Sequence, residues 1–98
     1  MKFVVIFKAK IKHLDENYIS MANQLRLKAL SEFNCQKFES ITENEHEIAL
    51  SYWNSLADIE AWHINTEHQI AQKYGKEKWY SHFSVEICEI HRSYQTRL

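Results

Sequence analysis

The side chains best suited to chemistry lie in one segment, residues 51–80 of the 98-residue chain. This segment holds all three tryptophans, three of the five tyrosines, two of the six histidines and the only glycine. His68 is the natural proton acceptor there, because an unperturbed imidazole titrates at about pH 6.5. Tyr52, Tyr80 and Trp62 can donate O–H or N–H hydrogen bonds beside an apolar wall. The segment therefore either builds the core or lines a cavity that binds a small molecule.

The same residues also have purely structural interpretations, which the sequence leaves open. His68 can brace a helix through hydrogen bonds to the backbone, and tryptophans such as Trp53 and Trp79 are common in cores. His63 and His68 are five residues apart, which turns their side chains about 140° from each other on a helix. That separation does not make a metal-binding pair, and the remaining histidines are scattered, so no metal site is expected.

Length and composition limit the classes of protein to consider. A chain of 11.8 kDa is one domain, residues 1–98. Its net charge is −1 with no basic stripe, so no nucleic-acid partner is expected. No apolar run approaches the roughly 18 residues of a membrane span, and the first run is too short for a signal peptide. We therefore expect a cytoplasmic protein in which Cys35 and Cys88 are reduced thiols.

Hydrophobic periodicity predicts the elements that must position these residues. Asp15 is a suitable N-cap for the first helix, and Asn65-Thr66 is expected to interrupt the second, which Gly75 would close. Residues 76–81 are expected to form a turn or a short helix. The pattern predicts strands at residues 2–12, 35–42, 47–53 and 83–94 and helices at 15–33 and 55–74.

The order β-α-β-β-α-β predicts an α+β ferredoxin-like fold, in which two helices cover one face of a four-stranded antiparallel sheet. The first and last strands are apolar on both sides, as at Val4 and Ile6 or Cys88 and Ile90, and the handedness of crossovers suggests that these strands are central. The sheet face away from the helices would then expose apolar side chains. Pairing of two copies through this face, as a homodimer, would cover them.

A spaced set of residues supports a family resemblance: the run Ser51-Tyr52-Trp53-Asn54-Ser55, then Ile59, Trp62, Glu67-His68, Ala71-Gln72, Gly75, Trp79-Tyr80, Val85, Ile90, Arg92 and Tyr94. With this set the chain resembles the antibiotic biosynthesis monooxygenase (ABM) domain family over nearly its whole length. The resemblance implies a dimeric α/β barrel, in which two ferredoxin-like units join face to face.

The resemblance also implies a range of functions. Some members oxidise polycyclic aromatic molecules with molecular oxygen and without metal or flavin, whereas others degrade haem. The haem-degrading pattern combines an asparagine on the first strand, a tryptophan on the second helix and a histidine ten residues later. Here Trp62 matches the tryptophan, but Phe7 and Gln72 occupy the other two positions. Haem degradation is therefore the less favoured expectation.

The chain is accordingly expected to be a small monooxygenase that needs no cofactor and acts on an electron-rich aromatic or quinol-like molecule. The expected catalytic residues are His68 and Trp62, and the expected substrate contacts are Phe7, Tyr52, Trp79 and Tyr80. The alternative is a non-catalytic dimeric module of the same fold that binds a small apolar ligand. An enclosed cavity that touches both His68 and Trp62 would support either, whereas a cavity filled by Phe7, Tyr52 and Trp79 would contradict both.

Overall fold

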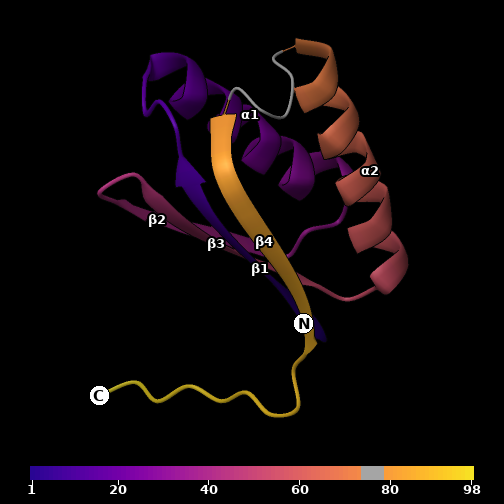
Figure 1. The fold of residues 1–98 in the computed structure, drawn as a ribbon. Helices are drawn as coiled ribbons and strands as arrows, with labels where there is room; N and C mark the ends of the chain where they lie inside the picture. The colour runs from indigo at the N-terminus through magenta and orange to yellow at the C-terminus, as the bar shows by residue number, and fades with distance from the viewer. Residues whose placement is uncertain (74–78) are drawn as a thin grey trace.

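The structure is a computed structural model that describes residues 1–73 and 79–98, with side chains described for residues 1–67 and 79–98. The six elements follow one another as βαββαβ (Figure 1), which confirms the ferredoxin-like fold. Their bounds are β1 Phe3–Ile11, α1 Glu16–Glu32, β2 Lys37–Glu43, β3 His46–Trp53, α2 Leu56–Lys73 and β4 Tyr80–Glu89. In the described part of the chain, no helix is long and apolar enough to cross a membrane.

The four strands form one antiparallel sheet in the order β2-β3-β1-β4, and both helices cover the same face of it (Figure 1). The prediction that the last strand is central is wrong, because β4 lies at the edge. Helix α1 connects β1 to β2, and α2 connects β3 to β4; the two strands of each pair are parallel and are separated by one strand. Strand β3 lies between β1 and β2, and β1 lies between β3 and β4. The two central strands are therefore β1 and β3, while β2 and β4 form the edges.

Two further expectations about element bounds are corrected. Helix α2 runs without interruption through Asn65 and Thr66, because it packs along the sheet and tertiary packing outweighs weak local propensity. Strand β4 ends at Glu89 instead of Tyr94, and residues 91–98 are exposed and form no regular element. The expected roles of Gly75 and of residues 76–78 lie outside the described residues.

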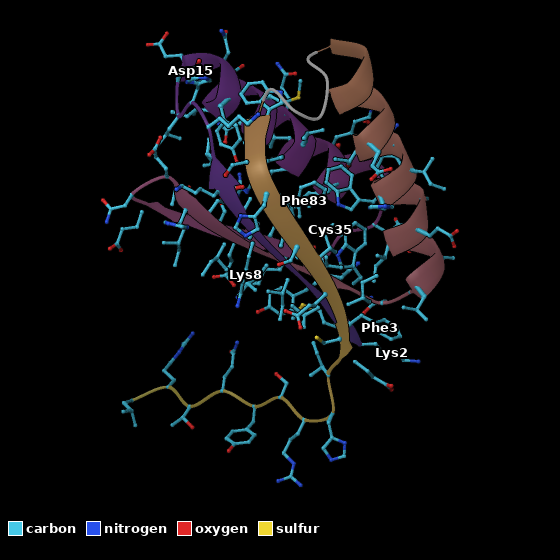
Figure 2. All side chains as sticks on the ribbon, viewed as in Figure 1. Lys2, Phe3, Lys8, Asp15, Cys35 and Phe83 are labelled. Carbon is cyan, nitrogen blue, oxygen red and sulfur yellow. The ribbon has the colours of Figure 1, made fainter. Side chains whose placement is uncertain are left out.

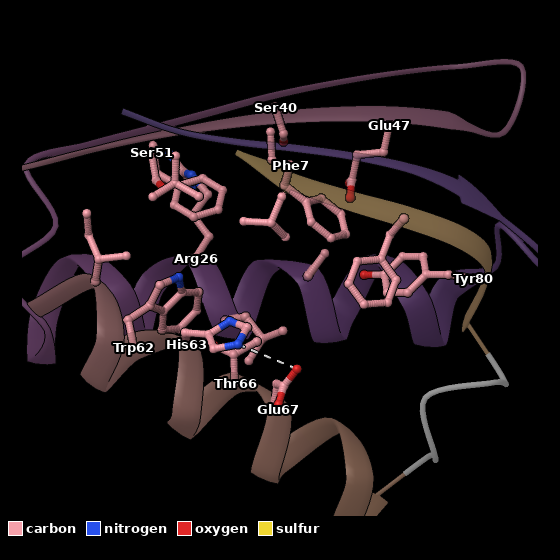
Figure 3. A pocket seen from close by; sticks show the side chains of 18 of the residues that line it. Phe7, Arg26, Ser40, Glu47, Ser51, Trp62, His63, Thr66, Glu67 and Tyr80 are labelled. Carbon is pink, nitrogen blue, oxygen red and sulfur yellow. Dashed lines mark ion pairs between the residues drawn. The ribbon is translucent and has the colours of Figure 1, made fainter. Parts of the chain in front are cut away.

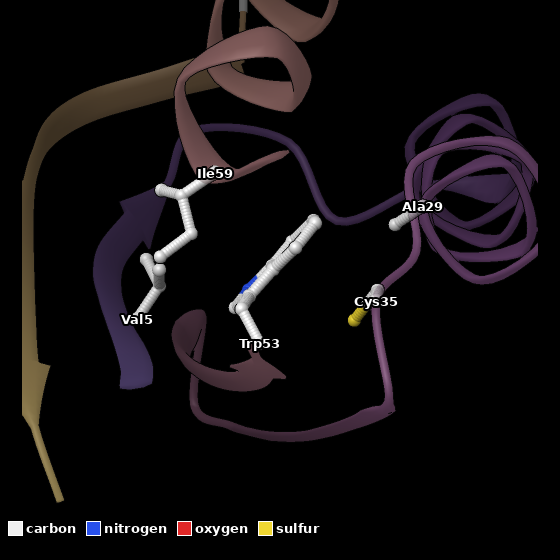
Figure 4. Packing of buried hydrophobic residues seen from close by; sticks show 5 residues of the cluster. All are labelled: Val5, Ala29, Cys35, Trp53 and Ile59. Atoms are coloured by element: carbon white, nitrogen blue, oxygen red, sulfur yellow. The ribbon is translucent and has the colours of Figure 1, made fainter. Parts of the chain in front are cut away.

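The core at one end of the sheet is built around Trp53, whose side chain is completely buried (Figure 4). Val5, Ile59, Ala29 and Cys35 surround it, so β1, β3 and both helices meet at this point. The Trp53 indole Nε1 donates a hydrogen bond of 2.8 Å to Ser51 Oγ, which satisfies its buried donor. Trp53 is therefore a core residue. Cys35, which packs beside it, is a free thiol, as is Cys88.

A second apolar cluster lies at the other end, where Ile11, Tyr18, Met21 and Trp79 are buried together. Helix α1 is held there by Asp15, which is its N-cap as expected and lies at its start (Figure 2). The Asp15 carboxylate accepts a hydrogen bond of 2.9 Å from the backbone N–H of Tyr18. The N-cap thus fixes the first turn of the helix, which carries Tyr18.

Candidate functional site

A cavity of about 440 Å³ lies between the two apolar clusters, bounded by the helix-covered face of the sheet and by α1 and α2 (Figure 3). Its volume is in the range of small-molecule sites. Most of its wall is apolar, and Val5, Leu25 and Ile59 contribute from three different elements. Phe7, Tyr52 and Trp79, the three side chains that could have filled such a cavity, therefore leave this space open.

Three of the expected site residues line this cavity, namely Phe7, Trp62 and Tyr80. The rings of Phe7 and Tyr80 meet edge to face, with centroids 5.4 Å apart. The Trp62 indole is held between two other aromatic rings, 5.9 Å from Phe33 and 6.4 Å from Trp53 between centroids. These contacts fix two flat aromatic surfaces on different sides of the cavity.

The other three expected site residues do not contribute to the described wall. Tyr52 points to the outer face of the sheet, because it alternates with the inward-facing Ser51 and Trp53, and it does not line this cavity. Trp79 is buried behind the ring of Tyr18, with centroids 5.1 Å apart, and does not line the cavity. The side chain of His68 lies outside the described residues, so its role stays a prediction.

Two polar residues that the sequence reasoning missed lie at one end of the cavity, Glu47 on β3 and Tyr18 on α1. The Tyr18 hydroxyl donates a hydrogen bond of 2.6 Å to Glu47 Oε2. Only 4% of Tyr18 and 8% of Glu47 is exposed, so the pair is shielded from bulk water. A signal was present, because extending the inward-facing row of Ala49, Ser51 and Trp53 by one step reaches Glu47.

Burial controls the protonation of this group of residues. Burial raises the pKa of Glu47 above its usual value, and the hydrogen bond from Tyr18 partly lowers that pKa again. Burial also raises the pKa of Tyr18, and the neighbouring Tyr80 and Glu47 raise it further. The pKa of Tyr80 is raised to about 12, again mainly by burial. Both phenols are therefore neutral hydrogen-bond donors at physiological pH.

The cavity opens along the edge of the sheet at β4. Phe83, Val85 and Ile87 are paired with inward-facing residues of β1 and line the cavity, yet 43%, 40% and 54% of these side chains is exposed. Strand β4 thus forms an apolar rim over which a small molecule can enter. In the described part of the chain, no group of three or more His, Cys, Asp or Glu residues is arranged to hold a metal ion.

Charged groups on the two helices complete the lining. Arg26 projects from α1, while His63 and Glu67 form an i,i+4 pair on α2 with His63 Nε2 3.6 Å from Glu67 Oε1 (Figure 3). Glu47 and Tyr80 lie toward one end of the cavity, and Trp62 and Ser51 toward the other (Figure 3). The arrangement can hold an aromatic molecule against Phe7 and Trp62 and bind its polar group at Glu47.

Solved structures share this fold. PA3566 from Pseudomonas aeruginosa superposes with a TM-score of 0.73 at 15% identity, covering 93% of this chain and 95% of that one. NE2512 from Nitrosomonas europaea, a protein of unknown function, gives 0.72 at 12% identity over 98% and 95%. A mutant of MhuD with two manganese protoporphyrin IX molecules bound per active site gives 0.58 at 13% identity over 95% and 99%.

These likenesses show the fold alone, and the class that they define is that of small proteins with a ferredoxin-like fold. The chain belongs to the family of YqjZ, an uncharacterized protein of Bacillus subtilis (strain 168). The two are 30% identical over 91 residues, which cover 92% of this chain and 80% of YqjZ. No protein-family model matches the chain.

Proposed function

We propose that this protein is a small monooxygenase that oxidises an electron-rich aromatic or quinol-like molecule in the cavity, using molecular oxygen and no cofactor. The supporting observation is a largely apolar cavity of about 440 Å³ with aromatic walls and a buried carboxyl at one end. Oxygenation without a cofactor needs such a shielded space, together with a group that turns the substrate into an electron-rich anion. Some members of the ABM family, which the sequence resembles, carry out this kind of chemistry.

The proposed reaction starts from an aromatic molecule with a hydroxyl group. Loss of the hydroxyl proton leaves its electron pair on the oxygen and makes the ring electron-rich. A ring carbon that carries hydrogen then bonds to molecular oxygen, and the resulting peroxide loses water to leave a carbonyl. The product therefore gains one oxygen atom and loses two hydrogens, and the second oxygen atom leaves as water. Oxygen accepts all the electrons, so no other oxidant is needed.

In this proposal, Trp62 orients the ring and Phe7 and Tyr80 supply further apolar contact. His68 is the candidate proton acceptor that the sequence predicts, and oxygen uptake by His68→Ala tests this role. The alternative function, a dimeric module that binds a small apolar ligand without reaction, would use the same cavity. The two functions differ in whether oxygen is consumed.

The test is oxygen uptake with a set of hydroxynaphthalenes, followed by mass spectrometry with isotopically labelled oxygen. We expect one labelled atom in the product and one in water, with a rate above the protein-free blank. Trp62→Ala should lower kcat/KM by about tenfold or more, because the ring loses its packing surface. The matched control is Ile64→Ala on the same helix, where the side chain is 60% exposed. Binding of the aromatics without oxygen uptake would contradict the monooxygenase and support the binding module.

A porphyrin is the ligand that the MhuD structure suggests, but the residues of this cavity do not fit haem degradation. Phe7 presents a phenyl ring to the cavity at the position where the haem-degrading pattern has an asparagine. The buried Glu47 adds an acidic group at the end of the cavity, where a porphyrin carboxylate would be repelled. A titration of the protein with haem, beside titrations with the hydroxynaphthalenes, compares the affinities for the two kinds of ligand.

We also propose that the protein acts as a homodimer joined through the outer face of the sheet. That face carries apolar side chains on the two central strands, Val4 and Ile6 on β1 and Ile48 and Leu50 on β3. Lys8 lies on the same face, pointing away from the helices (Figure 2). A second copy packed there would cover the apolar patch and leave the cavity, on the helix side, open.

A further inference from the structure

Glu47 is in an unusual position for a carboxyl group. Strand β3 points it inward, only 8% of the residue is exposed, and it lines the cavity. Among the described interactions it has no ion pair with Lys or Arg, and its side-chain hydrogen bond comes from Tyr18. A buried carboxylate without a cation is costly, so a carboxyl group in this position is a candidate for a functional role.

The hydrogen bond with Tyr18 occupies only one of the two carboxyl oxygens. Tyr18 donates to Oε2 at 2.6 Å, while no hydrogen bond to Oε1 is described. Tyr18 itself is held rigidly, because Asp15 binds its backbone N–H and its ring packs against Trp79 and Tyr80. Oε1 can therefore accept a hydrogen bond from a molecule in the cavity, while Oε2 stays in place.

The geometry points to Glu47 as the catalytic base that takes the proton from the hydroxyl group of the bound aromatic molecule, with Tyr18 as the residue that positions its carboxylate. This inference rests on the proposed function. In the step, the O–H bond of the substrate breaks, the proton moves to Glu47 Oε1 and the electron pair stays on the substrate oxygen. Tyr18 keeps its own proton throughout. The substrate class is thereby narrowed to aromatics with a free acidic hydroxyl.

The protonation behaviour of the site is consistent with this role. A carboxyl whose pKa is raised by burial holds an accepted proton more strongly than an exposed one. Tyr80, with its pKa raised to about 12, stays neutral and can donate a hydrogen bond to the substrate anion. Among the residues whose side chains the structure describes, the other titratable or charged groups that line the cavity are Tyr18 and Arg26 on α1 and His63 and Glu67 on α2.

The test uses 4-nitrophenol as a probe, because its phenolate absorbs at longer wavelength than the phenol and its electron-poor ring resists oxidation. We expect wild-type protein to bind the probe partly as phenolate at a pH about one unit below the probe's pKa in solution. Glu47→Gln keeps the side-chain shape and should lower this phenolate fraction at least tenfold. The control, Glu60→Gln at an exposed position of α2 that does not line the cavity, should leave it unchanged.

Tyr18→Phe provides a second measurement. Without the Tyr18 hydroxyl, the carboxyl loses the hydrogen bond that lowers its pKa and becomes a stronger base, so the bound probe should ionise at a lower pH than in wild type. A merely structural role for Tyr18 would weaken binding without moving this pH. Equal phenolate fractions in wild type and Glu47→Gln would overturn the inference, as would failure of the wild type to bind the probe at millimolar concentration.

The oxygen-uptake assay separates this inference from the proposed function. If Glu47 is the base, Glu47→Gln should lose about 100-fold or more in rate, the contribution typical of a general base. If His68→Ala loses that activity and Glu47→Gln keeps it, the monooxygenase stands and Glu47 is not the base. If the wild type ionises the probe but consumes no oxygen, Glu47 acts as a proton acceptor and the proposed oxidation fails.

Discussion

At the scale of single residues, Glu47 should make the stability of the protein depend on pH. Because burial raises its pKa in the folded state, folding favours the protonated form. The stabilisation is complete below about pH 4.5, the ordinary value for this carboxyl, and is lost as pH rises through the raised folded pKa. Glu47→Gln does not titrate, so its free energy of unfolding relative to wild type should rise across that window.

Urea unfolding of both proteins, followed by circular dichroism at a series of pH values, measures this difference. Other groups titrate in the same range, but they are common to both proteins and cancel in the comparison. Glu60→Gln on α2 is the control and should follow wild type within about 0.5 kcal/mol, as expected for an exposed position away from the cavity and the outer face of the sheet. A constant difference between Glu47→Gln and wild type at all pH values would show that burial does not change the pKa of Glu47.

The sequence pointed to aromatic residues of the cavity wall more readily than to polar ones. Phe7, Trp62 and Tyr80 line the cavity, because large apolar residues of the inward face have few other places to lie. Tyr52 was assigned to the site although strand alternation puts it opposite Trp53. Glu47 was missed because composition treats a lone glutamate as a surface residue, and only the register of the strand reveals that it points inward.

At the scale of elements, α1 determines where Tyr18 lies, and Asp15 determines where α1 begins. Asp15→Ala removes the side-chain acceptor for the backbone N–H of Tyr18, so we expect a loss of about 1 kcal/mol in the free energy of unfolding. The same change should loosen the first turn and weaken the hydrogen bond between Tyr18 and Glu47. The pH at which bound 4-nitrophenol changes its protonation should therefore shift in the same direction as in Tyr18→Phe, but by less.

Asn17→Ala in the same turn is the matched control, because Asn17 is exposed and is not the cap. Its stability should be that of wild type or slightly higher, since alanine favours helix. Unfolding in urea measures both variants. Equal stability of Asp15→Ala and Asn17→Ala would contradict the role of the cap in holding α1.

The elements themselves were largely predictable, because their periodicity and caps are local. The order of the strands in the sheet was not predictable in this way. The position of β4 at the edge depends on how the two crossover connections, through α1 and α2, are arranged relative to each other in the sheet. The break expected at Asn65-Thr66 failed for a related reason. Both residues are poor helix formers, yet α2 continues and leaves Asn65 Oδ1 and Thr66 Oγ1 buried without a described hydrogen-bond partner. Packing of the whole helix against the sheet outweighs this local cost.

At the scale of the whole molecule, the two faces of the sheet differ: one lines the cavity and the other exposes apolar side chains. The helix-covered face holds the cavity, which opens at the β4 edge beside Phe83 and Val85. The outer face carries Ile41 and Ile48, which are paired across β2 and β3 and are 73% and 45% exposed. A chain of this size gains stability by covering such a patch, and doing so leaves access to the cavity unchanged.

We therefore expect sedimentation equilibrium at micromolar concentration to give twice the chain mass of 11.8 kDa for the wild type. Ile48→Asp puts a charge at the centre of the outer face, where pairing with a second copy would bury it, and should give the mass of one chain. Leu27→Asp is the control, because Leu27 is 59% exposed on α1, away from that face, and should leave the dimer intact. A wild type of 11.8 kDa would contradict the dimer. Because the cavity belongs to one chain, 4-nitrophenol should still bind to the monomeric variant, provided that the variant stays folded.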